Sequence, residues 1–238
     1  QSTLPLLHNK AEVPKEFNKI AKRYNFANVF NHGYREDLHT SVQRMQLRGD
    51  EHMLDLCCGT GLSTQACLEH LPHGTLIGVD FSEGMLSVAR QNFATESRAS
   101  FSCQDAMQLD FPSQSFDAIF MAYGIRNMPD PQRCLQQLHQ LLKPGGTLCI
   151  HEYSLSAHAL AKPYWLTLGY GFILPFCTLL TGNASIFRYL IQSVTHFPRP
   201  PQFTRMLQDA GFQDVSCTPL KFWRAPILKT FLAHKHNA

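Results

Sequence analysis

The sequence lacks several features that would point to particular classes of protein. It has no block of Lys or Arg, and its formal net charge of +3 is small for 238 residues. Both properties argue against a partner made of nucleic acid. The 12 histidines are scattered without the spacing of metal ligands, and none of the eight cysteines forms a C-x-x-C pair. We therefore expect no metal site, and we expect small buried cysteines in a reducing compartment.

Two common phosphate-binding motifs are also missing. An apolar run at 53–56 leads into a turn with Gly59 and Gly61, and a helical pattern follows, which indicates a strand, a turn and a helix that seat a nucleoside. However, Thr64 occupies the third-glycine position of a dinucleotide fingerprint, and no Gly-Lys-Ser/Thr of a P-loop follows. A turn preceded by Asp55 and without a phosphate-seeking cation suits a ligand with a positive centre and no phosphate. S-adenosylmethionine fits this description.

Acidic residues follow two further predicted strands. Asp80 closes the apolar run 75–79, about 20 residues after the turn, where nucleoside-binding folds place the acid that reads the ribose. Asp105 follows a short strand at 99–103. Carboxyl ends of parallel strands form the ligand side of such a sheet, so both acids are candidates for cofactor binding.

Strand patterns alternate with helix patterns from residue 51 to residue 153. This alternation predicts an α/β fold with a doubly wound, seven-stranded, mostly parallel, Rossmann-like sheet. We expect an N-terminal arm and helical cover at 1–50, the nucleoside-binding core at 51–153, a lid insertion at 154–200, and a C-terminal helix with two closing strands, antiparallel to each other, at 201–238.

The predicted lid insertion is apolar and rich in aromatic residues. After Lys162, residues 163–180 carry no charge, and the length of this run approaches that of a membrane span. Gly169, Gly171 and Pro175 interrupt the run, which falls between two strands of one sheet. We therefore expect a lid over an apolar substrate and not a span.

Several motifs together resemble a known family. The sequence is similar to class I S-adenosylmethionine-dependent methyltransferases, and more narrowly to the C-methyltransferases of ubiquinone and menaquinone biosynthesis, over roughly residues 15–235. The motifs that carry this resemblance are Leu54-Asp55-Leu56-Cys57-Cys58-Gly59-Thr60-Gly61, Val79-Asp80-Phe81-Ser82, Tyr123-Gly124-Ile125-Arg126-Asn127, Leu142-Lys143-Pro144-Gly145-Gly146, Glu152-Tyr153-Ser154 and Tyr189-Leu190. The chain departs from the family pattern at Cys57-Cys58, usually Ala-Gly, at Leu62, usually Asp, and at His151, usually an aliphatic residue.

The resemblance implies which residues bind the cofactor, S-adenosylmethionine, and its product, S-adenosylhomocysteine. Gly59, Thr60 and Gly61 would contact the methionyl end, Asp80 the ribose, and Phe81 the adenine. The complete expected set is Tyr24, Asp55, Gly59, Thr60, Gly61, Asp80, Phe81, Met85, Asp105, Ala106 and Ala122.

Three residues are candidates for catalysis. Arg126 would stabilise a phenolate, and Asn127 would orient it or a water molecule. The alternative for Arg126 is an ion pair with an acid such as Asp130. His151 could act as a base near neutral pH, and its alternative is a core histidine with satisfied hydrogen bonds.

The expected acceptor is an apolar aromatic small molecule. A prenylated quinol that is methylated on carbon fits the resemblance best, and the residues expected to bind it are His32, Tyr123, Tyr153, Tyr164, Phe172 and Tyr189. Two alternatives stay open: a natural-product O-, N- or C-methyltransferase, and a non-catalytic protein that binds a partner through its lid.

The sequence also leads to expectations about location and assembly. We expect a cytoplasmic protein, and a lipid-dissolved substrate would favour peripheral contact with a membrane. The chain begins at Gln1, without Met, so N-terminal targeting is not visible. The oligomeric state stays open, with a homodimer among the options.

Overall fold

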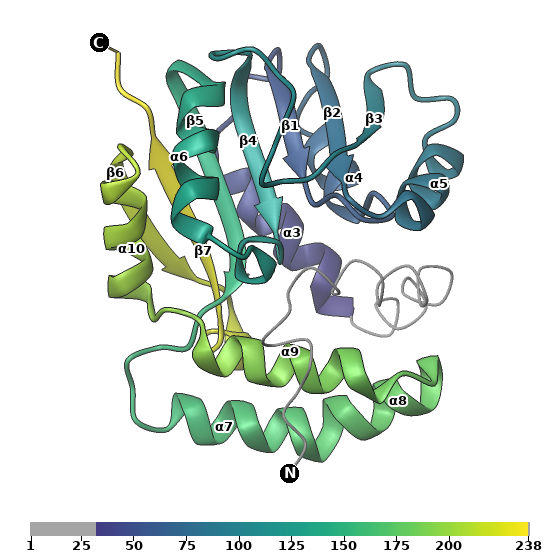
Figure 1. Ribbon diagram of the computed structural model, residues 1–238, viewed down its shortest axis with the longest axis vertical. Coiled ribbons are helices and arrows are strands. Elements are labelled where there is room, and N and C mark those ends of the chain that lie inside the picture. Colours follow the sequence, from purple (N-terminus) through teal and green to yellow (C-terminus); the bar gives the residue numbers. More distant parts are fainter. Residues whose placement is uncertain (1–31, 238) are drawn as a thin grey trace.

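The computed structural model describes residues 32–237, which form one seven-stranded sheet with helices around it (Figure 1). The strand order is β3-β2-β1-β4-β5-β7-β6. Strands β1 to β5 pair in parallel, and β7 pairs antiparallel with both β5 and β6. The predicted doubly wound, mostly parallel sheet is therefore confirmed. The strands are β1 (His52–Leu56), β2 (Thr75–Asp80), β3 (Ala99–Cys103), β4 (Phe116–Ala122), β5 (Leu142–Tyr153), β6 (Gln213–Pro219) and β7 (Leu228–His234).

Helices connect the strands and cover the sheet. The helices are α3 (His32–Arg44), α4 (Leu62–Leu68), α5 (Glu83–Asn92), η2 (Ile125–Asn127), α6 (Pro131–Leu141), α7 (Ala161–Leu168), η3 (Gly169–Ile173), α8 (Leu174–Thr181), α9 (Ala184–His196), α10 (Pro200–Asp209) and η4 (Phe222–Arg224). Residues 143–146 form an irregularity within β5, between the residues that pair with Phe116 and Ala118 of β4.

Both faces of the sheet are buried, as expected for parallel strands between layers of helices. One apolar cluster joins the sheet to α6 and α10 through side chains such as Leu138 and Phe203. A second cluster joins the other face to α3 and α4 through Leu38 and Cys67. The strand order reverses between β1 and β4, which is the point where such folds bind ligands at the carboxyl ends of the strands.

Side chains fix the starts of two helices near that point. Ser82 caps α5, and its hydroxyl accepts a hydrogen bond from the backbone N–H of Met85 at 3.1 Å. Asp130 caps α6 in the same way by accepting from the N–H of Arg133 at 3.0 Å. Both helix starts agree with the residues expected at N-caps.

The lid forms a separate layer of helices across the carboxyl ends of the strands (Figure 1). The run α7-η3-α8, residues 161–181, is the one helical run among the described residues that is long and apolar enough to cross a membrane. It lies along α9: the indole N–H of Trp165 donates to the carbonyl of Ile191 at 3.0 Å. Gly169 also lies against the side chain of Ile191. These contacts bury one side of the run, but only 17% of its most apolar 18-residue window is buried.

Two glycines in η3 provide a matched test of this packing. A Cβ at Gly169 would lie 2.8 Å from Ile191 Cγ1, whereas a Cβ at Gly171 would meet nothing within 4 Å. We expect Gly169→Ala to lower the free energy of unfolding by about 1 kcal/mol or more through overpacking. Gly171→Ala should raise it by up to about 1 kcal/mol, because alanine favours helix. Denaturant unfolding of both variants measures the difference, and equal stabilities would contradict this packing.

Candidate active site

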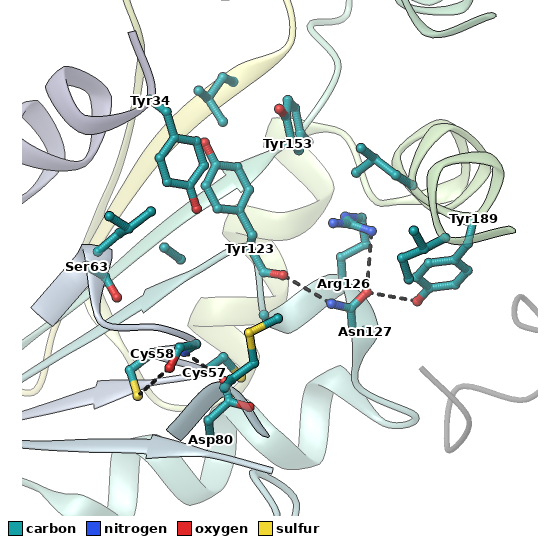
Figure 2. Close-up of a pocket in the computed structure, with 18 of the residues that line it drawn as sticks. Tyr34, Cys57, Cys58, Ser63, Asp80, Tyr123, Arg126, Asn127, Tyr153 and Tyr189 are labelled. Atoms are coloured by element: carbon teal, nitrogen blue, oxygen red, sulfur yellow. Dashed lines mark hydrogen bonds between the residues drawn. The ribbon is translucent and has the colours of Figure 1, made fainter. Parts of the chain in front are cut away.

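A cavity of about 890 Å³ opens at the carboxyl ends of β1, β2 and β4. The turns after these strands form its floor, the lid helices form one wall, and η4 with the start of α3 forms another. Figure 2 shows Asp80, Cys57 and Cys58 on one side of it, the tyrosines at 34, 123 and 153 on another, and Arg126, Asn127 and Tyr189 grouped together.

The backbone is strained where β1 and β4 end. Cys57 has φ 60° and Tyr123 has φ 57°, a region that residues other than glycine seldom adopt. Both residues line the cavity. A Cβ at Gly124 would lie 2.7 Å from the Cys57 sulfur, so the two turns pack closely against each other. Such strain persists where the surrounding packing holds it, and it is frequent at ligand sites.

The carboxylate of Asp80 connects two of the turns. Its Oδ2 accepts from the N–H of Gly59, and its Oδ1 accepts from the N–H of Ser82, each at 2.9 Å. Burial raises the pKa of Asp80, and the backbone hydrogen bonds oppose that effect. Each carboxylate oxygen has a further lone pair, so Asp80 can still accept hydrogen bonds from a diol in the cavity.

Most of the expected cofactor residues share this cavity. Its wall includes Gly59, Thr60, Asp80, Phe81, Met85, Asp105, Ala106 and Ala122. Phe81 is exposed at the cavity edge, so its ring is accessible to a flat ligand. The lining combines a carboxylate, an aromatic ring and a backbone turn, and it fits S-adenosylmethionine. The described residues contain no group of three His, Cys, Asp or Glu that could hold a metal ion.

Two of the expected cofactor residues lie elsewhere. Asp55 is fully buried behind the turn, where its Oδ2 accepts from the hydroxyls of Ser63 and Thr64 at 2.8 and 2.7 Å. Burial raises the pKa of Asp55 to about 7. Gly61 begins α4 with φ 95° and faces a neighbouring pocket. Asp55 therefore stabilises the start of α4 through Ser63 and Thr64, and Gly61 provides the backbone conformation at which that helix begins. Tyr24 lies outside the described residues.

Arg126 is a buried cation in the cavity wall. Its guanidinium forms an ion pair with Glu152, with Nε and Oε1 3.3 Å apart, and it also donates to the hydroxyl of Ser193. Asn127 Oδ1 accepts from Arg126 at 3.4 Å and from the Tyr189 hydroxyl at 2.9 Å (Figure 2). The partner of Arg126 is thus Glu152 and not Asp130, which caps α6. Burial raises the pKa of Glu152, and the attraction of Arg126 opposes this.

His151 lies outside the cavity wall, in the core beneath it. Its Nδ1 is 2.7 Å from the Ser41 hydroxyl and its Nε2 is 2.9 Å from the Tyr123 hydroxyl. Burial lowers the pKa of His151 to about 3, and the positive charges of Arg44 and Arg224 act in the same direction. The expectation of a base at His151 does not fit this geometry, because both ring nitrogens have partners and none faces the cavity. The structure agrees with the alternative, a core histidine.

The expected acceptor-binding residues converge on the lid side of the cavity. Tyr123, Tyr153, Tyr164, Phe172 and Tyr189 all line it. Tyr123 stacks on Tyr34, with ring centroids 5.3 Å apart. His32 is the first residue of α3, and its side chain lies outside what the structure describes.

A second buried ion pair in the wall had no clear signal in the sequence. Arg224 Nε lies 2.7 Å from Asp37 Oδ2, and both side chains are largely buried. Burial raises the pKa of Asp37 to about 6, although Arg224 opposes the shift. The two residues come from α3 and η4, far apart in the chain. Asp37 follows Tyr34 by one turn on the face of α3 that packs inward, and this periodicity was the available hint.

The chain is similar in sequence to known methyltransferases over most of its length. The model of the ubiE/COQ5 methyltransferase family matches residues 6–225. The demethylmenaquinone methyltransferase of Geobacillus kaustophilus is 32% identical over 228 residues, covering 91% of this chain and 95% of that one. The enzyme of the same name from Staphylococcus aureus strain JH9 is 33% identical over 211 residues and covers 87% of each chain.

Solved structures share the fold at lower sequence identity. A Haemonchus contortus phosphoethanolamine N-methyltransferase in complex with S-adenosylhomocysteine has a TM-score of 0.64 and 17% identity, covering 86% of this chain and 53% of that one. The [4+2]-cyclase SpnF has a TM-score of 0.67 and 18% identity, covering 95% and 96%. The fold is thus compatible with more than one reaction, and the family match decides the class. The chain is an S-adenosylmethionine-dependent methyltransferase and belongs to the ubiE/COQ5 methyltransferase family.

Proposed function

We propose that this enzyme methylates a ring carbon of a prenylated quinol of the menaquinone or ubiquinone type. The observation that carries the proposal is the buried guanidinium of Arg126 in a largely aromatic and aliphatic cavity wall. A phenolic oxygen that loses its proton needs such a cation, because the pKa of a free phenol is near 10. The relatives named demethylmenaquinone methyltransferase support this class of acceptor.

Asp80 sets the orientation of the cofactor in this proposal. Its carboxylate accepts hydrogen bonds from the ribose hydroxyls, Phe81 lies against the adenine, and the turn at Gly59 and Thr60 holds the methionyl end. When bound, S-adenosylmethionine supplies an electrophilic methyl group and leaves as S-adenosylhomocysteine. The protein holds donor and acceptor in line for the transfer, which is the main contribution such a fold makes.

Arg126 and its partners act on the acceptor. Glu152 and Ser193 hold the guanidinium in one orientation, and Asn127 connects it to the lid through the Tyr189 hydroxyl. Arg126 stabilises the phenolate, which places electron density on the ring carbon that forms the new C–C bond. The hydroxyl proton passes to the proposed base before the transfer, and the sulfur–methyl bond of the donor breaks as the C–C bond forms. The ring carbon then loses its proton to water, which makes the ring aromatic again.

Asp37 is the group that we propose accepts the hydroxyl proton. It lines the cavity, and its pKa of about 6 suits proton transfer near neutral pH. The charged groups that act on it are Arg224, Glu36 and Arg44. His151 acts in this proposal as a positioning residue, through its hydrogen bond to Tyr123.

A natural-product methyltransferase is the second candidate. The specific observation in its favour is the cavity wall built by Trp223, Arg224 and Asp37, which places a largely buried ion pair beside the acceptor. A screen of demethylquinols and simple phenols with labelled S-adenosylmethionine, analysed for carbon and oxygen methylation, separates the two. Methylation of phenol oxygens alone would contradict the quinol proposal.

Removal of the Asp80 carboxylate tests the cofactor assignment. Asp80→Ala should weaken S-adenosylmethionine binding at least about 30-fold, because it loses charge-assisted hydrogen bonds worth about 2 kcal/mol or more. Calorimetry measures the affinity, and thermal unfolding checks the fold. Glu83→Ala is the control, since Glu83 is an exposed acid in the first turn of α5. Unchanged affinity in folded Asp80→Ala would exclude the assignment.

Replacement of Arg126 tests the phenolate assignment. Arg126→Ala should lower kcat about 100-fold and leave the affinity for S-adenosylmethionine within about threefold, as for loss of one group that stabilises developing charge. This change leaves Glu152 buried without its cation. The double variant Arg126→Gln/Glu152→Gln replaces the ion pair with two neutral amides and so separates the effect on catalysis from the effect on folding. Arg133→Ala, at an exposed position on α6, is the control. Full kcat in the double variant would end the proposed role.

The pH dependence distinguishes Asp37 from His151. A base is active when it is ionised, so kcat/KM should rise with pH through a pKa near 6 in the wild type. Asp37→Asn should remove this rise and lower kcat about 100-fold. His151→Gln retains a donor and an acceptor and should keep the rise and most of the activity. The opposite pattern, with the rise lost only in His151→Gln, would assign the base to His151.

A further inference from the structure

The exposed apolar side chains of this protein are concentrated in one region. Nine large apolar side chains are exposed among the described residues, and Phe81 is the one outside this region. The others define what we call the apolar face: Leu160, Tyr164, Tyr170, Phe172, Phe176, Leu179, Phe222 and Trp223. Leu179 and Phe222 are each 84% exposed. Contiguous exposure of this kind marks an interaction surface.

Two segments that are distant in sequence form the apolar face together. The α7-η3-α8 run and Leu160 just before it contribute six of the side chains, and η4 contributes Phe222 and Trp223. The Tyr164 hydroxyl donates to the carbonyl of Trp223 at 3.1 Å, which joins the two. Tyr164, Phe172, Phe176 and Trp223 also line the cavity. The active-site cavity therefore opens on the apolar face.

Charge is distributed unevenly between the two parts of the chain. Residues 1–152 contain 13 Lys or Arg and 16 Asp or Glu, whereas residues 153–238 contain eight Lys or Arg and two Asp or Glu. No acidic residue occurs from 153 to 208. Lys162 on α7 and Lys221 next to η4 are exposed beside the apolar face. An apolar surface flanked by cations and free of acids in the lid sequence complements a membrane with anionic lipids.

The helix geometry indicates contact with a membrane surface and not a span. Trp165 and Gly169 hold one side of the run against α9. A further contact joins Ile173 and Leu174 to the buried cluster of Ile186, Phe187 and Tyr189 on α9. The run is thus part of the folded domain on one side and uncovered on the other, like a helix that lies in the plane of an interface.

We propose that the apolar face docks on an anionic phospholipid bilayer and that the acceptor passes from the bilayer directly into the cavity. The route for the acceptor rests on the proposed function, whereas docking does not. A cavity of about 890 Å³ is of the size that holds one or two drug-sized ligands. With cofactor and quinol ring inside, a long prenyl tail has to extend through the mouth, and the apolar face lets it remain in lipid.

Vesicle flotation tests the docking without cofactor or acceptor. The full chain should float with vesicles of phosphatidylcholine containing about 30% phosphatidylglycerol and bind less to phosphatidylcholine alone, because basic side chains near the surface contribute about 1 kcal/mol each. Leu179→Ser/Phe222→Ser should reduce binding at least about 10-fold through lost apolar insertion. Neither residue lines the cavity, so methylation of a short-chain, water-soluble quinol should be unchanged in this variant.

Charge reversal provides the matched electrostatic test. Lys162→Glu/Lys221→Glu should reduce binding to the anionic vesicles at least about 10-fold, whereas Arg48→Glu/Arg133→Glu should not, since these exposed residues lie outside the apolar face. Thermal unfolding verifies that all variants are folded. Equal binding by all variants, or no binding to either vesicle, would overturn the proposal. So would a wild-type dimer in light scattering that Leu179→Ser/Phe222→Ser converts to a monomer without any vesicle binding.

The two tryptophans give a site-specific signal for the same contact. Trp165 is fully buried, whereas Trp223 is 49% exposed on the apolar face. Anionic vesicles should shift the Trp223 emission to the blue and make it accessible to quenching by brominated lipids. Trp223→Phe should remove both effects while vesicle binding persists. If the screen finds no methylation of quinols but Trp223 reports vesicle contact, the quinol acceptor is refuted and the docking proposal stands.

Discussion

The hydrogen bonds of the Asp80 carboxylate are the constraint on which the site depends. One oxygen holds the turn after β1 through Gly59, and the other holds the start of α5 through Ser82. The same carboxylate lines the cavity, so the group that we propose binds the ribose diol also fixes the two backbone segments around it. Because burial raises the pKa of Asp80, its charge is maintained by these donors, and a ligand that adds hydroxyl donors stabilises it further.

The fold, and the position of the strand-end acids at the cavity, could be predicted from the sequence because their signals are local. Apolar runs of strand length and the Gly59-x-Gly61 turn each depend on neighbouring residues. Residues at the end of a parallel strand reach the ligand side by topology alone, which places Asp80 and Asp105. Asp55 shows the limit of this reasoning: it precedes the turn, but its side chain faces α4.

The acceptor half depends on contacts between distant segments, which no local pattern encodes. The sequence suggested Asp130 as an ion-pair partner for Arg126, whereas in the structure Glu152 of β5 forms the ion pair. The sequence also suggested His151 as a base. However, side chains along β5 point alternately to the two faces of the sheet, and the His151 ring lies on the face that contacts Ser41. Cys57 is explained by the fold: a small side chain fits where the turn after β1 packs against Gly124. The Asp37–Arg224 pair joins the two ends of the described chain.

Arg126 and Arg224 both line the cavity, and each pairs with a buried carboxylate, Glu152 and Asp37. Removing either partner from such a pair leaves an uncompensated buried charge, so each pair fixes its cation in one place. A cavity whose cations are paired repels a cationic cofactor less than one with free cations would. The net positive charge of the chain lies in its acid-poor part, residues 153–238, which carries the lid. Residues 1–152 are net negative, so the electric field of an anionic membrane would orient the protein with the cavity mouth towards the membrane before contact.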